Sequence, residues 1–359
     1  MIRLNLTTFY RYSLVLYLFV ISINIFLYIF FQVSEISLVG PNSGNDANVY
    51  HKVAIREYSR AINIWPEILR FLNDYGLYNR DYIKYTIYLL YLFVIPFLLY
   101  KSICNAIGIK RNKHIYRFIS IYMCLYPGLL LLTFDIYRDI FMLTLYSIFI
   151  YISSFIFNGN ISLIRKISFW IILLALSYVM FQARRYLGIS VFLGLLLYKL
   201  PINKINIIIL TIGYFSMLLI FRESGLIDPL LDYRGQNGFT VGDSTLGIGL
   251  INKHGFEFIS YFIISSLAQF FNLYITSIRS LIVFLVEAIP IFFMLCYIYK
   301  NRLISNEYIK FFIIFLIIYT SFWVIGNDNV GTAIRLRIFS YFSIFLPFTF
   351  ILFYKKNSQ

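Results

Sequence analysis

Long apolar runs alternate with short polar connections along almost the whole chain. A helix needs about 20 mainly apolar residues to cross the hydrocarbon core of a bilayer, and eleven runs approach or reach this length. They cover approximately residues 12–32, 84–102, 115–133, 140–157, 167–182, 186–200, 205–221, 256–278, 281–299, 311–326 and 338–354. The pattern predicts an all-α, polytopic integral membrane protein whose helices form a single membrane domain, 1–359.

The composition supports this fold class. Hydrophobic residues make up 60% of the chain and charged residues 13%, roughly half the charged share of an ordinary soluble domain, which excludes a soluble enzyme. The three cysteines lie in or beside apolar runs, so we predict no disulfide framework, no metal site and no cofactor. The first run, 12–32, is too long for the apolar part of a signal peptide and is interpreted as a retained span.

Basic connections indicate which side of the membrane each loop occupies. By the positive-inside rule, short loops rich in Lys and Arg are cytoplasmic. The alternation of sides holds through the seventh run, but Lys300 and Arg302 fall on the wrong side if 256–278 crosses completely. That run carries polar residues such as Ser265 and Gln269, so we interpret it as a re-entrant or interfacial helix. About ten transmembrane helices remain, with both termini in the cytoplasm.

This topology accounts for the formal net charge of +15. Sixteen Lys and Arg residues fall on the cytoplasmic side with one acid, Glu307, and the other fifteen basic residues are balanced by fifteen acids. The basic excess is therefore a membrane signal, and no nucleic-acid partner is expected. Twelve of the fifteen outer basic residues are arginine, whose planar guanidinium binds phosphate with two hydrogen bonds. The outer side is thus predicted to bind an anionic ligand.

Two long segments, 33–83 and 222–255, are predicted to lie on the outer side and to cover an active site. The first contains an amphipathic stretch, about 49–72, which we expect to form a helical hairpin on the outer leaflet. The second is rich in Gly and Asp and is typical of a folded loop or lid. No internal repeat is evident along the chain.

Asp46 and His51 form the first polar cluster, just before the amphipathic stretch. At a helix start, one would lie near the N-cap and the other about a turn later, and both could face one cavity. The alternative is that Asp46 is only an N-cap and His51 only a surface residue.

Asp135, Arg138 and Asp139 form the second cluster, at a tight outer turn between two runs. They share one face if a helix begins here. Charges so close to hydrocarbon are costly without partners, so this is either part of a site or a stabilising salt bridge in the turn.

Arg184 and Arg185 form the third cluster, in a turn that contains no acid. Their charges need a partner from elsewhere in the fold or from a ligand, for which a pyrophosphate is suitable. Contact with lipid headgroups is the alternative.

Residues 326–337 form the fourth cluster and lead into the last run. Arg335 and Arg337 are two positions apart and do not share a helical face, so only one needs to point at a site. Backbone amides near Gly331 could bind an anion, although an ordinary polar loop is the alternative. Glu287 is the one acid deep within an apolar run, and either a functional role or a structural pair with a basic residue is open.

With these clusters in place, the chain resembles bacterial polytopic glycan polymerases and related membrane glycosyltransferases that act on polyprenyl-linked sugars, of which the Wzy O-antigen polymerases are the best known. The resemblance rests on Gly44-Asn45-Asp46 with Tyr50-His51, on Tyr137-Arg138-Asp139, on Arg184-Arg185, and on Asn329-x-Gly331-Thr332-x-x-Arg335-x-Arg337. Together with the apolar profile, these motifs spread over most of the chain.

The resemblance implies that a hydroxyl of one lipid-linked oligosaccharide attacks the anomeric carbon of another and expels polyprenyl pyrophosphate. The expected catalytic residues are Asp46, His51 and Asp139, with Asp46 or His51 as the base; Asp46 is expected to be catalytic in a single-transfer enzyme as well. The expected pyrophosphate-binding residues are Arg138, Arg184, Arg185, Arg335 and Arg337.

The same resemblance implies a place and partners. The protein is expected in the bacterial inner membrane, working at its outer face, with membrane lipid and a chain-length regulator protein as partners. Two alternatives remain at this point. One is a multi-span glycosyltransferase that adds a single sugar from a polyprenyl-phosphate donor, and the other is a flippase or transporter of lipid-linked sugar.

Overall fold

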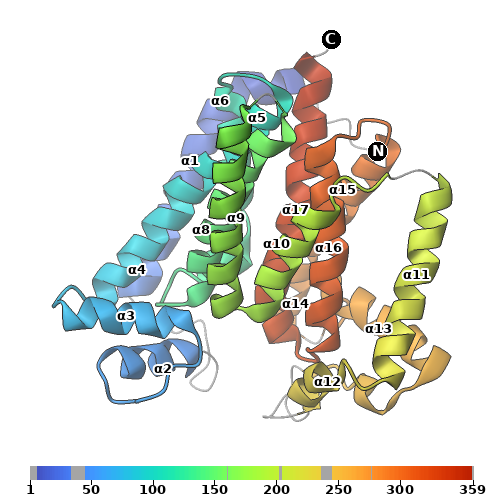
Figure 1. The fold of residues 1–359 in the computed structure, drawn as a ribbon. Coiled ribbons are helices and arrows are strands. Elements are labelled where there is room, and N and C mark those ends of the chain that lie inside the picture. Colours follow the sequence, from blue (N-terminus) through green and yellow to red (C-terminus); the bar gives the residue numbers. More distant parts are fainter. Residues whose placement is uncertain are drawn as a thin grey trace. The chain divides into compact units, whose positions relative to one another are not determined.

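The computed structural model describes residues 6–33, 45–159, 161–201, 204–235, 245–275 and 277–357 (Figure 1). The described chain is helical and contains no strand, only an isolated bridge between Thr245 and Asn329. Seven of its helical segments are long and apolar enough to cross a membrane. They are Thr8–Val33, Arg80–Ile107, Arg138–Phe157, Leu163–Ala183, Ser280–Lys300, Glu307–Ile325 and Val330–Lys356. The predicted all-α, polytopic membrane class is confirmed.

The contacts divide the chain into two compact units, each described here by itself. Unit 1 comprises Met1–Ile189 and Thr349–Gln359, and unit 2 comprises Ser190–Phe348. Unit 1 contains α1 (Leu6–Val33), α2 (Asn45–Ala54), α3 (Ile64–Asp74), α4 (Arg80–Leu89), η1 (Leu90–Val94), α5 (Ile95–Ile107), α6 (Lys113–Cys124), α7 (Pro127–Leu131), α8 (Arg138–Phe157) and α9 (Leu163–Ala183). The start of α10 (Arg185–Leu197) and the end of α17 (Val330–Asn357) also belong to it.

Unit 2 holds the remaining elements. These are the rest of α10 and α17, with α11 (Lys204–Glu223), α12 (Asp228–Gly235), η2 (Leu250–Asn252), α13 (Gly255–Phe270), α14 (Ile278–Val283), η3 (Phe284–Ala288), α15 (Ile289–Lys300) and α16 (Glu307–Ile325). α10 and α13 are apolar but shorter than the seven long helices. α13 covers the first part of the predicted re-entrant run, 256–278, and ends at Phe270; its relation to the bilayer stays a prediction.

One predicted span differs from the structure. The run 115–133 is not continuous, because α6 ends at Cys124 and α7 starts at Pro127. Proline disfavours helical backbone in the residue before it and lacks an N–H group of its own, and Tyr126 is accordingly extended. Both halves of the run are apolar, so the hydrophobic pattern alone does not show the break.

A buried polar group stabilises the broken end of α6. Asn24 of α1 is 2% exposed, and its amide nitrogen donates to the carbonyl of Cys124 (3.3 Å) and to the hydroxyl of Tyr91 (3.1 Å). The Tyr91 hydroxyl in turn donates to the carbonyl of Met123 (3.0 Å). Carbonyls at a helix end need partners where water is absent, and these side chains supply them.

Two of the long helices share an interruption. Each contains a π-helical segment of five residues, η1 or η3, followed directly by Ile and Pro, which are Ile95-Pro96 in unit 1 and Ile289-Pro290 in unit 2. The next helix in each unit, α6 or α16, starts after an asparagine N-cap at the same distance along the chain, Asn112 or Asn306. The units therefore share a local construction that sequence inspection did not reveal.

In unit 1, segments that the charge pattern assigns to the same side of the membrane contact each other. Segments predicted to be cytoplasmic meet at one end, where Arg117 donates to Ser13 (3.1 Å) and the Lys356 ammonium lies over the ring of Tyr10. Segments predicted to be outer meet at the other end, where Trp65 of α3 donates to the carbonyl of Ile136 (2.8 Å). Which end of this unit faces the cytoplasm stays a prediction.

Candidate functional site

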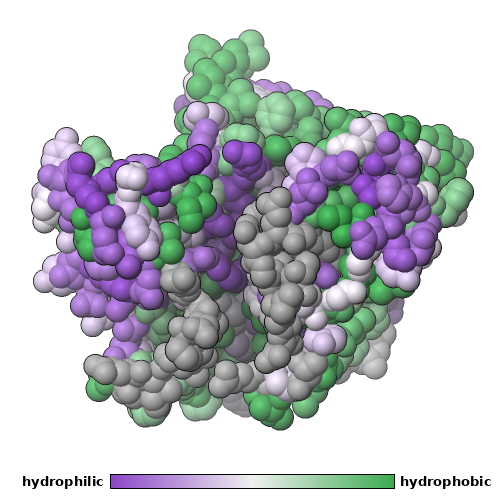
Figure 2. Space-filling model, turned by 90° about the horizontal axis from the view of Figure 1, so that it is seen from below, coloured by the Kyte–Doolittle hydropathy of each residue, from purple (hydrophilic) through white to green (hydrophobic). Residues whose placement is uncertain are grey.

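A cluster of charged and polar side chains lies at the predicted outer end of unit 1. It gathers residues from α2, from the start of α4, from the turn before α8 and from the junction of α9 and α10. Figure 1 shows α2 and α3 at this end of the long helices of unit 1, and hydrophilic side chains gather over these two short helices in Figure 2.

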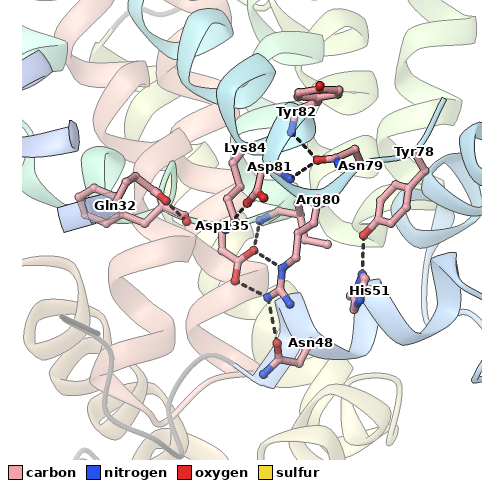
Figure 3. A network of polar contacts seen from close by, with 12 residues as sticks. Gln32, Asn48, His51, Tyr78, Asn79, Arg80, Asp81, Tyr82, Lys84 and Asp135 are labelled. Carbon is pink, nitrogen blue, oxygen red and sulfur yellow. Dashed lines mark hydrogen bonds and ion pairs between the residues drawn. The ribbon is translucent and has the colours of Figure 1, made fainter. Parts of the chain in front are cut away.

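Arg80 and Asp135 form a bidentate ion pair in this cluster (Figure 3). The side chain of Asn79 accepts hydrogen bonds from the amides of Asp81 and Tyr82 and so fixes the start of α4 at Arg80. The Arg80 guanidinium donates from Nε and Nη2 to the two carboxylate oxygens of Asp135, at 2.9 and 2.5 Å. Nη2 also donates to Asn48 of α2 (2.9 Å). The pair therefore ties three separate segments together.

His51 and Tyr78 form a second contact beside this pair (Figure 3). The imidazole Nδ1 lies 2.8 Å from the Tyr78 hydroxyl, and the two rings are stacked with centroids 5.8 Å apart. Burial, and then the positive charge of Arg80, lower the pKa of His51 below its usual value of 6.5. Burial raises the pKa of Tyr78 to about 12. At neutral pH, His51 is therefore a neutral imidazole beside a protonated phenol.

Asp139 and Arg184 form a buried ion pair. Arg184 Nη2 donates to Asp139 Oδ1 (3.0 Å), and the two residues are 6% and 2% exposed. Asp139 lies in the first turn of α8, where the helix dipole favours a negative charge. The partner that the sequence required for Arg184 is thus an acid from elsewhere in the fold.

Arg138 and Arg185 flank this pair. Nη1 of Arg138 donates to the carbonyl of Ala183 (3.2 Å), and its buried Nε has no hydrogen-bond partner among the described residues. Arg185 starts α10 and is exposed. Two further guanidinium groups thus lie beside the Asp139–Arg184 pair: that of Arg138, which uses some of its donors, and that of Arg185, which is exposed.

Asp46 is separated from His51 by the geometry of α2. Both residues lie in this helix, and Asp46 is in its first turn, partly exposed. Five positions on an α-helix correspond to a rotation of about 140° between side chains, so the two leave the helix on different sides. That both face one cavity therefore stays a prediction.

In unit 2, Arg337 of α17 pairs with Glu287 of η3. Arg337 Nη2 donates to Glu287 Oε2 (2.7 Å), and both side chains are fully buried. Arg335, two positions earlier, is only partly buried, which agrees with the expectation that the two arginines point in different directions. The neighbouring-helix partner considered for Glu287 is therefore present, and it is Arg337.

Sequence reasoning missed Arg80, Asn48 and Tyr78. Arg80 was counted only as one basic residue of a long outer segment. Its signal is Asn79, a good N-cap placed directly before it and ahead of an apolar run. No sequence feature indicates that Asn48 contacts Arg80 or that Tyr78 contacts His51, because these contacts join separate segments.

Two further findings bear on the chemistry. No group of three or more potential metal-binding side chains occurs in the part of the chain that the structure describes. No family model, curated protein or solved structure matches the chain.

Proposed function

We propose that the protein is a membrane glycosyltransferase that polymerises lipid-linked oligosaccharide units of the O-antigen or capsule type. In this proposal, it works at the outer face of the bacterial inner membrane and takes polyprenyl-pyrophosphate-linked sugars as substrates. The observation that carries it is the cluster of unit 1, in which arginines, carboxylates and a neutral imidazole gather at one end of membrane-spanning helices. A reaction between lipid-linked sugars needs polar groups at the ends of the membrane-spanning helices.

The proposed reaction forms one glycosidic bond and breaks another. The hydroxyl oxygen of an acceptor sugar attacks the anomeric carbon of the donor, its proton passes to a base, and the pyrophosphate leaves with the electron pair of the broken C–O bond. His51 is the favoured base, because its neutral imidazole accepts a proton at Nε2 when Nδ1–H donates to Tyr78. Asp46 is the second candidate. Asp139 is engaged by Arg184 and is better suited to hold that arginine in place.

The leaving pyrophosphate needs fixed positive charge. Arg185 is the favoured ligand in unit 1, since it is exposed, and Arg138, which is partly exposed, is the second. Arg184 and Arg337 are each held by a carboxylate, so direct binding by either requires that its ion pair rearranges. In unit 2, Arg335 is the more exposed of the two arginines of α17 and is the candidate there.

Deletion of the gene, followed by display of the surface glycan on a gel, tests this function. A polymerase predicts that the ladder of long glycans collapses to single repeat units that remain lipid-linked. A ladder of normal length whose repeats lack one sugar would instead indicate an enzyme that adds a single sugar.

Transport of lipid-linked sugar is the second candidate, and the paired interruptions favour it. Interrupted helices at corresponding positions of two halves are typical of transporter binding sites, and η1 and η3 with their Ile-Pro steps have this character. The charged cluster of unit 1, however, lies at helix ends, which favours chemistry at the membrane surface. Accumulation of unused units on the cytoplasmic side after deletion would support transport and contradict the polymerase.

A further inference from the structure

The predicted amphipathic hairpin consists of two helices that use their apolar faces differently. In α2, the apolar residues are buried in unit 1; they are Ala47, Tyr50, Val53 and Ala54. In α3, Trp65 and Leu69 are buried, whereas Phe71 is 59% exposed and the C-cap residue Tyr75 is 68% exposed. α3 therefore has more apolar surface than its packing in unit 1 covers.

α3 has three distinct faces. Trp65 and Leu69 are four positions apart and share the face that packs inward. Phe71 and Tyr75 are also four apart, lie on a face rotated by about 120° from the first, and contact each other with ring centroids 4.8 Å apart. A third, polar face carries Arg70, which is rotated by about 120° from each of the other two faces. A helix with an inner, a polar and a separate aromatic face is suited to a boundary between water and an apolar phase.

The exposed aromatic face continues into the exposed side of the next long helix. Leu77 follows it in the connection, and the same chain then exposes a series of apolar residues spaced by three or four positions along α4, η1 and α5. They are Tyr82, Tyr85, Leu89, Phe93 and Phe97. Arg80–Ile107 is one of the long apolar segments, so the flank of the helix that carries these exposed residues faces lipid. The exposed aromatic residues of α3 therefore come directly before a lipid-facing series along the chain.

We infer that Phe71 and Tyr75 of α3 insert into the interfacial region of the lipid bilayer. Aromatic rings favour this region, and the adjoining polar face of α3 would remain in water. Because Trp65 of the same helix stacks on Phe141 (4.8 Å) and donates to the carbonyl of Ile136, the bilayer contact is mechanically linked to the turn that carries Asp135. This inference does not depend on the proposed function.

Spin labelling tests the contact directly. Single cysteines replace Phe71, Tyr75 or Arg70 in a Cys296→Ser background, since Cys296 is the exposed native cysteine in the described chain, and residual labelling of that background is measured first. Each protein is labelled with a nitroxide and reconstituted in vesicles of phosphatidylethanolamine and phosphatidylglycerol. Collision with oxygen, which concentrates in lipid, is compared with collision with a water-soluble nickel chelate.

The inference predicts that labels at 71 and 75 collide mainly with oxygen and the label at 70 mainly with the nickel chelate. Preference for nickel at 71 and 75 would overturn it, and so would protection from both reagents, which would indicate contact with protein such as a second copy. Phe71→Trp provides a second measurement in a variant that keeps an aromatic ring. Brominated lipids should quench its added fluorescence relative to the parent, and equal quenching of variant and parent would contradict the inference.

Discussion

At the scale of single residues, Asp139 and Arg184 neutralise each other away from water. This pairing changes what a substitution at either position should do. Removing one member of a buried ion pair leaves an uncompensated charge, which costs more than the pair itself contributes. Both residues were expected to act on substrate directly, but in the structure each forms an ion pair with the other.

We expect Asp139→Asn and Arg184→Gln each to destabilise the folded protein by about 3–5 kcal/mol. The double variant, which leaves no unpaired charge, should recover part of this loss. Thermal unfolding in detergent, followed by the fraction that stays monodisperse, measures the effect. Single variants as stable as the parent would show that the pair is not formed in the membrane.

His51 should determine the acid side of the pH profile. Because its pKa lies below 6.5, the neutral form persists at neutral pH and is lost as the pH falls through that lowered value. Activity should therefore be constant near neutrality and decline at lower pH. His51→Gln should reduce turnover by about 10²-fold or more at every pH, whereas Tyr78→Phe, which keeps the imidazole, should shift the profile with a smaller loss. Undiminished turnover in His51→Gln would direct the search for the base to Asp46.

Arg185 offers a test of pyrophosphate binding with a matched control. Arg185 and Arg165 are both exposed and lie next to opposite ends of α9. Arg185→Ala should lower product formation at least about tenfold, the effect of losing about 1.4 kcal/mol of transition-state stabilisation, without loss of folded protein. Arg165→Ala should leave both unchanged. Equal activity of the two variants would exclude Arg185 from the site.

At the scale of elements, the junction of α9 and α10 positions Arg184 and Arg185 and depends on a glycine. A Cβ atom on Gly188 would come within 2.4 Å of the backbone nitrogen of Phe181. This contact is shorter than real Cβ atoms show, and backbone cannot move aside as a flexible side chain can.

Gly188→Ala should therefore displace the junction, destabilise the protein by about 1–3 kcal/mol or more and reduce product formation. Gly213→Ala in α11 is the control, because nothing lies within 4 Å of a Cβ there and alanine is the better helix former. Thermal stability and activity are measured on both variants. A fully active and stable Gly188→Ala protein would contradict the close approach.

The elements also show what the hydrophobic pattern can predict. Runs such as 140–157 and 167–182 correspond closely to α8 and α9, because a long apolar helix needs little besides its own composition. The break at Tyr126 and the π-helical segments were not predicted, since they arise from proline within apolar sequence and leave the pattern unchanged. The helical hairpin predicted for 49–72 is present as α2 and α3, and its contact with the outer leaflet stays a prediction.

At the scale of the whole molecule, the types of residue in the site were easier to predict from the sequence than the contacts among them. Charged clusters at 135–139 and 184–185 were found from sequence because arginine and aspartate beside hydrocarbon need partners. Which residues become those partners depends on segments far apart in the chain, as Arg80 with Asp135 and Glu287 with Arg337 demonstrate. The seven long helices confirm the membrane class, and transfer between lipid-linked sugars stays a proposal.

The most direct test of that proposal is reaction of the purified protein, reconstituted in vesicles, with radiolabelled polyprenyl-pyrophosphate oligosaccharide. We predict a ladder of longer glycans, with one polyprenyl pyrophosphate released for each bond formed, and its loss in Arg185→Ala but not in Arg165→Ala. Oligosaccharide that keeps its original length, whether it remains in place or crosses the bilayer, would contradict the account.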